Sequence, residues 1–249
     1  MNAAVWTPLS APPLLAEDEA HIWRASLPRL APAFERFVES LSPEERDRAA
    51  RFRKESDRRR YVATHGALRS LLAEYLDIDP RRLTLESASN GKPALKQPRR
   101  DIRFNISHSN DLALLAFTIG REVGIDVEEI RPIPDRDAVA RLFFSEGELR
   151  ALTSLEPAAQ TEAFFLCWTR KEAYLKAKGL GLSQNLRDFE VSLVPDQPAC
   201  LLACNADPAE LNRWRLESLR PAANFAAAVA AERQDWRMQL FEWQPARLL

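Results

Sequence analysis

Two acidic segments far apart in the chain place the strongest constraint on its fold. Residues 123–128 alternate apolar and acidic side chains, so Asp126 and Glu128 share one face of a predicted strand. In residues 168–176, by contrast, Trp168, Glu172 and Lys176 are spaced four residues apart, which places them on one stripe of a predicted helix. A fold that accommodates both segments needs a strand and a helix, and we expect the two to face each other.

If those faces meet, three carboxylates converge beside Lys176. Like charges at close range do not all stay ionised unaided, and a hard dication such as Mg²⁺, or Mn²⁺ in its place, is the simplest remedy. Glu172 lies on the apolar side of its helix, where a carboxylate is costly without a partner. Two ordinary readings stay open: an i,i+4 bridge from Glu172 to Lys176, and an exposed sheet face for Asp126 and Glu128.

Composition excludes several classes of protein. The chain has 249 residues, of which 46% are hydrophobic and 29% charged, as in soluble globular proteins. It has no run of roughly 18 apolar residues and no early basic-then-apolar leader, so we expect no membrane span, no secretory signal and a cytoplasmic protein. Its three cysteines form no even framework, and no histidine stands at a zinc-ligand spacing.

The chain divides into two halves of opposite charge. Residues 1–121 hold 20 Lys and Arg against 16 Asp and Glu, a net +4, whereas residues 122–249 carry −5. Each half shows helical patterns followed by strands, so we expect an α+β fold of two similar halves joined near residues 119–123, each with an antiparallel sheet packed on a long helix. The charge asymmetry suits an anionic ligand bridged by a cation and not nucleic acid, although chance scatter would explain it too.

Local signals mark the expected elements. Capping boxes at Ser42–Glu45 and Ser145–Glu148 open helices, the first running with a break to about Leu76. The first forty residues read as an extended entry, and the helix that carries Glu172 runs from Pro157 to Gly179. We expect a strand and its return over 83–95, strands over 104–107 and 112–118 joined by a turn at 108–111, and short antiparallel strands over 189–194, 214–219, 225–231 and 238–243.

A second group of residues is suited to phosphate. Asn105, Ser107 and His108 end an expected strand with small polar donors, which can hold phosphate oxygens. His108 fits an ordinary turn equally well, Lys92 fits an ordinary hairpin, and the dense basic stretch at 46–60 is usually a solvated face. The chain has no phosphate-binding glycine loop, no kinase motifs and no Ser-His-Asp elbow.

Four motifs in order resemble one family. They are Gly91-Lys92-Pro93, residues 104–109 (FNISHS), residues 124–128 (GIDVE) and residues 168–176 (WTRKEAYLK). Together they resemble the signature of 4′-phosphopantetheinyl transferases of the surfactin-synthetase-activating type, over roughly residues 42–183. The resemblance implies a single-chain pseudo-dimer of two α+β halves, residues 1–121 and 122–249, with the coenzyme A side in the first, the metal and catalytic motifs in the second, and the site at their interface.

The resemblance also implies the reaction. Such enzymes move 4′-phosphopantetheine from coenzyme A to a serine of an apo acyl or peptidyl carrier protein and release adenosine 3′,5′-bisphosphate, with Mg²⁺ held here by Asp126, Glu128 and Glu172. Glu172, or a water on the metal, would take the serine proton. Lys176 and His108 would hold phosphate oxygens, Arg48 and Lys92 the nucleotide end, and Asn90 and Gly91 the adenine. Pro93, Asn105 and Ser107 belong to the same binding motifs.

One position departs from the family pattern. Glu45 stands where some relatives carry a lysine near the 3′-phosphate, so which of Arg48, Arg51 and Arg60 compensates stays open. A metal-dependent phosphohydrolase and a non-catalytic coenzyme A-binding module are the competing functions. A monomer is expected, with carrier protein and coenzyme A as partners.

The expected docking surface for the carrier lies between the two acidic segments. Residues 136–152 hold Arg141, Phe143, Phe144 and Arg150. Apolar anchors with a basic rim suit an acidic partner helix. Phe144 is also placed to staple the helix that follows, so Phe143 is the preferred contact; the alternative is that both rings belong to the core.

Overall fold

The chain forms two compact units, seen in a computed structural model that describes residues 5–87, 92–96, 100–179, 184–233 and 235–245. We name each unit after its long helix. The α3 unit holds the described residues of 5–87, 93–120 and 237–245. The α6 unit holds Lys92 and the described residues of 121–236. The last strand of the chain lies in the α3 unit, together with residues from its first half.

The sheet of the α3 unit has the order β1-β12-β2-β6-β5. Its strands are β1 (Thr7–Leu9), β2 (Glu19–Ser26), β5 (Ile102–Ser109), β6 (Leu112–Ile119) and β12 (Arg237–Trp243). β12 runs parallel to both β1 and β2, and the other pairs are antiparallel. The expectation of a wholly antiparallel sheet was therefore wrong for this unit, because a distant strand inserts between β1 and β2.

Helical segments of the α3 unit follow β2 directly. They are η1 (Leu27–Ala33), α1 (Phe34–Ser40), α2 (Pro43–Ala50), α3 (Glu55–Leu76) and the short η2 (Pro80–Arg82). The predicted capping box is present, with Ser42 accepting from the backbone N–H of Glu45 and Glu45 accepting from that of Ser42. The expected break separates α2 from α3. The expected extended entry was wrong over residues 27–40, which are helical.

The core of the α3 unit lies between α3 and the sheet. Trp23, Leu68, Leu71 and Phe117 are fully buried there, and burial of each such side chain contributes about 1.5–3 kcal/mol. A Cβ on Gly66 would lie 2.2 Å from the Phe37 ring, so glycine allows α1 to pack closely on α3. A small hairpin of β3 (Leu85–Ser87) and β4 (Pro93–Leu95) completes the unit and confirms the expected strand and return.

The α6 unit contains an antiparallel sheet of order β10-β11-β7. These strands are β7 (Val123–Glu129), β10 (Trp214–Leu219) and β11 (Phe225–Glu232). A second pair joins β8 (Phe189–Val191) to β9 (Leu201–Cys204), and β9 was not anticipated. The helical segments are α4 (Arg136–Phe143), α5 (Glu146–Ser154), α6 (Pro157–Lys178), η4 (Leu186–Asp188) and α7 (Glu210–Arg213).

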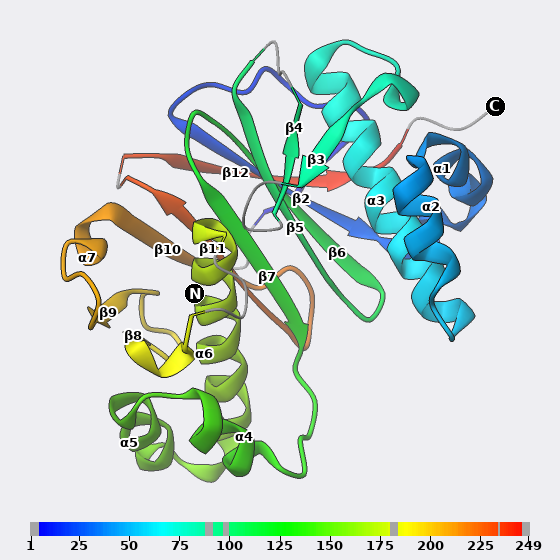
Figure 1. Ribbon diagram of the computed structural model, residues 1–249. Coiled ribbons are helices and arrows are strands. Elements are labelled where there is room, and N and C mark those ends of the chain that lie inside the picture. The colour runs from blue at the N-terminus through cyan, green and yellow to red at the C-terminus, as the bar shows by residue number, and fades with distance from the viewer. Residues whose placement is uncertain (1–4, 88–91, 97–99, 180–183, 234, 246–249) are drawn as a thin grey trace. The chain divides into compact units, whose positions relative to one another are not determined.

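Helix α6 packs along β7 and β11 (Figure 1). Pro157 occupies its first turn, where a missing N–H costs nothing, and Gly179 ends it at φ 69°. Both ends agree with the sequence prediction, as does the Ser145–Glu148 capping box of α5. Each unit thus packs a long helix on a sheet, and the predicted α+β class is confirmed. Within the described residues, no helix is both long and apolar enough to span a bilayer.

Candidate active site

Strand β7 carries the first acidic motif as predicted. Asp126 pairs in register with Ala228 of β11, and Glu128 pairs with Ala226. Alternation places both carboxylates on one face, while Ile125 and Val127 are fully buried on the other. Asp126 is itself 4% exposed. A carboxylate buried this deeply needs a compensating charge.

Gly124 explains how close the strand and helix come. A Cβ at this position would lie 2.1 Å from the carbonyl oxygen of Ala173 and 2.2 Å from the nitrogen of Ala177. The backbones of β7 and α6 therefore touch where only glycine fits. Asp126 and Glu128 share the face of Gly124, so this contact directs both carboxylates toward α6.

Helix α6 contributes Glu172 and Lys176 to the site. The Lys176 ammonium lies 2.6 Å from Asp126 Oδ1 and 3.3 Å from the carbonyl oxygen of Ile125. Burial raises the pKa of Glu172, and the negative charges of Asp126 and Glu128 raise it further, against the opposing effect of Lys176. Asp126, Glu128 and Lys176 thus act electrostatically on Glu172, and we refer to the four side chains as one electrostatic unit.

The donor set suits a hard cation, although its side chains do not enclose one as they lie. Among the described residues, no three His, Cys, Asp or Glu side chains are grouped as a ready-made metal site. Carboxylate oxygens are nonetheless what Mg²⁺ prefers, and burial, followed by repulsion from Asp126 and Glu128, raises the pKa of Glu172. The chemistry of Asp126, Glu128 and Glu172 thus fits a divalent ion.

Other residues of the α6 motif are structural, which the sequence did not reveal. Lys171 lies 2.8 Å from the Glu148 carboxylate and donates to the carbonyls of Leu186 and Phe189, and its side chain is 1% exposed. Burial raises the pKa of Glu148, which Lys171 and the backbone N–H of Val191 oppose. Lys171 therefore ties α6 to α5 and to the segment leading into β8.

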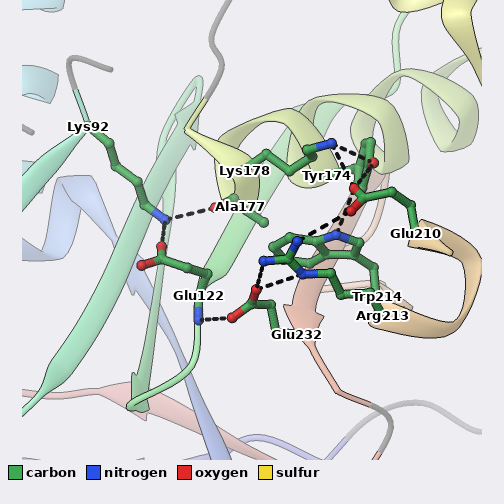
Figure 2. Close-up of polar contacts among 9 residues, drawn as sticks. All are labelled: Lys92, Glu122, Tyr174, Ala177, Lys178, Glu210, Arg213, Trp214 and Glu232. Carbon is green, nitrogen blue, oxygen red and sulfur yellow. Dashed lines mark hydrogen bonds and ion pairs between the residues drawn. The ribbon is translucent and has the colours of Figure 1, made fainter. Parts of the chain in front are cut away.

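Arg170 and Tyr174, four residues apart and therefore on one face of the helix, hold it at two further points. Arg170 donates to the backbone and side-chain oxygens of Ser192, and burial lowers its pKa to about 10. The Tyr174 hydroxyl donates to Glu210 at 2.5 Å. Glu210 also accepts from Trp214 at 3.0 Å and pairs with Lys178 at 2.7 Å (Figure 2). These contacts lie on faces of α6 other than the one that carries Glu172 and Lys176.

Lys92 lies in the α6 unit. Its ammonium is 2.8 Å from Glu122 Oε2, 2.8 Å from the carbonyl oxygen of Val123 and 3.3 Å from that of Ala177. It is therefore engaged at the β7–α6 contact. Asn90 and Gly91, expected near an adenine, lie outside the described residues, and Pro93 begins β4.

The expected phosphate donors of β5 do not share one face. The strand extends to Ser109, so His108 pairs with Ala113 inside the ladder and does not lie in the turn, which is only Asn110 and Asp111. Strand alternation places Asn105 and Ser107, both buried, opposite in direction to exposed His108. The predicted four-residue turn was wrong because ladder pairing outweighs the turn preference of a polar run.

The basic stretch contributes arginines in different settings. Arg48 lies over the Tyr61 ring at 5.7 Å, whereas Arg60 is bound by Asp57, Asn110 and Asp111. Arg51 is the exposed C-cap of α2. None of the three is fully buried, so each keeps access to solvent.

Glu45, the position that departs from the family pattern, has a structural role. It caps α2, lies 3.0 Å from Arg69 and 3.3 Å from His65. Hydrogen bonds from His65 and Ser42, with the charge of Arg69, lower the pKa of Glu45 against its burial. The carboxylate thus holds α2 against α3, a function that its capping-box position partly foretold.

Strand β7 and helix α6 thus carry the three carboxylates and the lysine, and comparisons with protein families identify the class of protein. Residues 122–230 match the 4′-phosphopantetheinyl transferase superfamily, and residues 23–119 match the 4′-phosphopantetheinyl transferase N-terminal family. The chain belongs to the 4′-phosphopantetheinyl transferases and is such an enzyme, as the motifs predicted.

Individual relatives agree. The chain is 37% identical over 240 residues to the 4′-phosphopantetheinyl transferase HetI of Nostoc sp. strain PCC 7120, covering 96% of this chain and 98% of that one. It is 33% identical over 162 residues to Sfp of Bacillus subtilis strain 168, covering 65% and 70%. Thermotoga maritima holo-[acyl-carrier-protein] synthase overlaps 45% of this chain and 63% of its own at 25% identity and TM-score 0.37, too little to support an argument.

Proposed function

We propose that this enzyme transfers 4′-phosphopantetheine from coenzyme A to a serine of an apo carrier protein and releases adenosine 3′,5′-bisphosphate, with Mg²⁺ required. The observation that carries the proposal is the electrostatic unit of Asp126, Glu128, Glu172 and Lys176 across the β7–α6 contact. Phosphoryl transfer needs little covalent chemistry from a protein. It needs positioning and neutralisation of charge, which this cluster would provide together with the divalent ion it holds.

Asp126, Glu128 and Glu172 would hold the divalent ion, Mg²⁺ or Mn²⁺. When bound, the ion neutralises diphosphate charge and orients its oxygens. Lys176 pairs with Asp126 in the structure. Because an ion on Asp126 would supply the compensating positive charge there, Lys176 could exchange its carboxylate partner for a phosphate oxygen of the substrate.

Glu172 is the proposed general base. Burial raises its pKa, which suits a carboxylate that accepts a proton, and a water on the ion is the alternative acceptor. In the step itself, the serine oxygen forms a bond to the β-phosphorus of coenzyme A, and the bond from that phosphorus to the bridging oxygen breaks. Adenosine 3′,5′-bisphosphate leaves, and the serine proton passes to Glu172.

Binding of coenzyme A is proposed for the α3 unit. Arg48, Arg51 and Arg60 are the candidates for the 3′-phosphate, since all three keep some exposure. His108, exposed at the end of β5, is a further phosphate donor. Hydrogen-bonded, charged contacts of this kind mainly set substrate affinity.

The carrier is proposed to dock on α4. Leu142 is 67% exposed and Phe143 is 37% exposed, beside exposed Arg141. Phe143 meets Trp168 of α6 edge-on, with 5.6 Å between ring centroids. Phe144, by contrast, is fully buried. Two large apolar side chains and a cation on one helix end suit an acidic, partly apolar partner helix.

One assay tests the function. The purified chain is incubated with coenzyme A, Mg²⁺ and an apo carrier protein, and the intact mass of the carrier is measured. A gain of one phosphopantetheine mass, dependent on Mg²⁺, is expected. Free phosphopantetheine released without carrier would indicate a phosphohydrolase instead, and binding of coenzyme A without turnover would indicate a binding module.

A further inference from the structure

Charged side chains contact the C-terminal turn of α6 on two sides. Figure 2 shows the Lys92 ammonium between the Glu122 carboxylate and the carbonyl of Ala177. On the other side, Lys178 reaches Glu210 and Tyr174. Ala177 and Lys178 directly follow Lys176 in the helix. The position of this turn therefore determines where Glu172 and Lys176 lie relative to β7.

Lys92 is chemically suited to hold this turn. The last carbonyls of a helix have no partner within the helix and form the negative end of its dipole. The Lys92 ammonium donates to one of these carbonyls, on Ala177, and simultaneously to the carbonyl of Val123, the first residue of β7. Its side chain is 12% exposed, so little water competes for these bonds.

The same contact is the closest approach of the two elements. Gly124 abuts Ala173 and Ala177, next to the Val123 carbonyl that Lys92 binds. A second chain of contacts supports Glu122: its backbone N–H donates to Glu232, whose carboxylate is held by Arg213 at 2.6 Å (Figure 2). Lys92 therefore bonds both elements at the point where their spacing is fixed.

We propose that Lys92 is a positioning residue that sets the distance between the carboxylates of β7 and Glu172 and Lys176 of α6. This rests on the proposed function, and it differs from the nucleotide-binding role that motif resemblance implies for Lys92. A group that binds coenzyme A acts mainly on substrate affinity. A group that aligns the reacting cluster acts on turnover, because misplacement by about 1 Å costs up to roughly a hundredfold in rate.

The test compares Lys92→Met, Glu122→Gln and the double variant. We expect each single variant to lower kcat by about tenfold or more, with the KM and the calorimetric Kd for coenzyme A changed by less than about threefold. Because one contact is broken in all three, the double variant should be no slower than Lys92→Met alone. Lys92→Arg should recover part of kcat.

A matched control removes an ion pair from the other end of the same helix. Arg220, which is exposed, pairs with the half-buried Glu162 of α6. Arg220→Met should leave kcat unchanged. The proposal is overturned if Lys92→Met weakens coenzyme A binding tenfold while Glu122→Gln leaves kcat intact. It is overturned equally if both variants lower only the melting temperature and keep full kcat.

A readout independent of turnover separates this proposal from the function on which it rests. Amide hydrogen exchange, followed by mass spectrometry, should accelerate in β7 and in the last two turns of α6 in Lys92→Met, and not in Arg220→Met. If the parent chain shows no transfer activity, the proposed function fails, and the exchange data still decide whether Lys92 holds the two elements together. Unchanged exchange in Lys92→Met would refute that role.

Discussion

The two long helices have the same length, 22 residues, and differ in what they hold. Helix α3 packs mainly apolar side chains into the core, and Arg69 is the charged side chain that it buries. Helix α6 buries both Arg170 and Lys171 and binds a different neighbouring segment with each. A helix that presents reactive groups on one face needs its other faces fixed, and α6 achieves this with polar contacts to several neighbouring segments.

The largest expected effect is on the reactive face of α6. Glu172→Ala should lower kcat by about 10³-fold, equivalent to about 4 kcal/mol, because the divalent ion that would balance the diphosphate charge loses one of its ligands. Asp126→Ala should match it, and Glu128→Ala should be milder, since water can replace one Mg²⁺ ligand. Steady-state kinetics on folded protein checks this. Near-normal turnover of Glu172→Ala would end the convergent-carboxylate model.

Next comes the fixed side of α6. Lys171→Met leaves Glu148 buried without its charge partner and should lower the free energy of unfolding by about 3–5 kcal/mol. Arg69→Met in α3 should cost less, because Glu45 is 13% exposed and keeps Ser42 and His65 as partners. Urea denaturation measures both. Equal losses would remove the distinction between the helices.

Substrate affinity should respond in the α3 unit. Arg48→Ala is expected to raise the KM for coenzyme A by about tenfold, with kcat changed less, if Arg48 meets the 3′-phosphate. Such a variant should barely distinguish coenzyme A from dephospho-coenzyme A. Arg51→Ala and Arg60→Ala are compared in the same assay, with Arg81→Ala as control because its pair with Asp79 is exposed. Normal discrimination by every variant would exclude this stretch as the reader of that phosphate.

Acid should loosen the α7 side of α6. Burial alone would raise the pKa of Glu210, but Lys178, Tyr174 and Trp214 together lower it below its ordinary 4.5. A carboxyl whose pKa is lowered on folding stabilises the native state above its unfolded pKa, and that contribution fades as pH falls through the folded value. Stability of the parent should therefore drop below about pH 4.5, more steeply than that of Glu210→Gln. Parallel pH profiles would count against this network.

The smallest expected effect concerns the carrier. Phe143→Ala should raise the KM for the carrier by about three- to tenfold and leave coenzyme A binding intact. Arg141→Glu should slow association most at low salt, where steering is least screened. Stopped-flow association and carrier titrations measure these changes. Normal binding by both folded variants would move the docking surface away from α4.

Much of the α6 unit follows from local pattern. The boundaries of β7 and α6 were predictable because short-range signals determine them. These signals are the alternation across 123–128, the proline at 157 and the glycine at 179. The role of Lys171 was not, since a lysine between Arg170 and Glu172 reads as solvated. Its burial depends on Glu148 and on carbonyls of a later segment, which no local pattern reveals.

The errors in the α3 unit have the same origin. His108 was assigned to a turn from its polar neighbours, whereas pairing with β6 keeps it in the strand. The strand at 238–243 was recognised, but its parallel partners β1 and β2 lie at the opposite end of the sequence. Long-range pairing selects among local preferences, and it is not encoded in any short window.

The place of β12 has a consequence for how the chain is made. β12 lies between β1 and β2 in the sheet, yet it follows the whole α6 unit in sequence. Apart from Lys92, the described residues of the α6 unit belong to one continuous stretch, residues 121–236, which can fold during synthesis. In the α3 sheet, by contrast, β1 and β2 both lack their shared partner strand, β12, until the whole α6 unit has been synthesised. Premature termination just before Arg237 would therefore spare the acidic cluster and damage the unit proposed to bind coenzyme A.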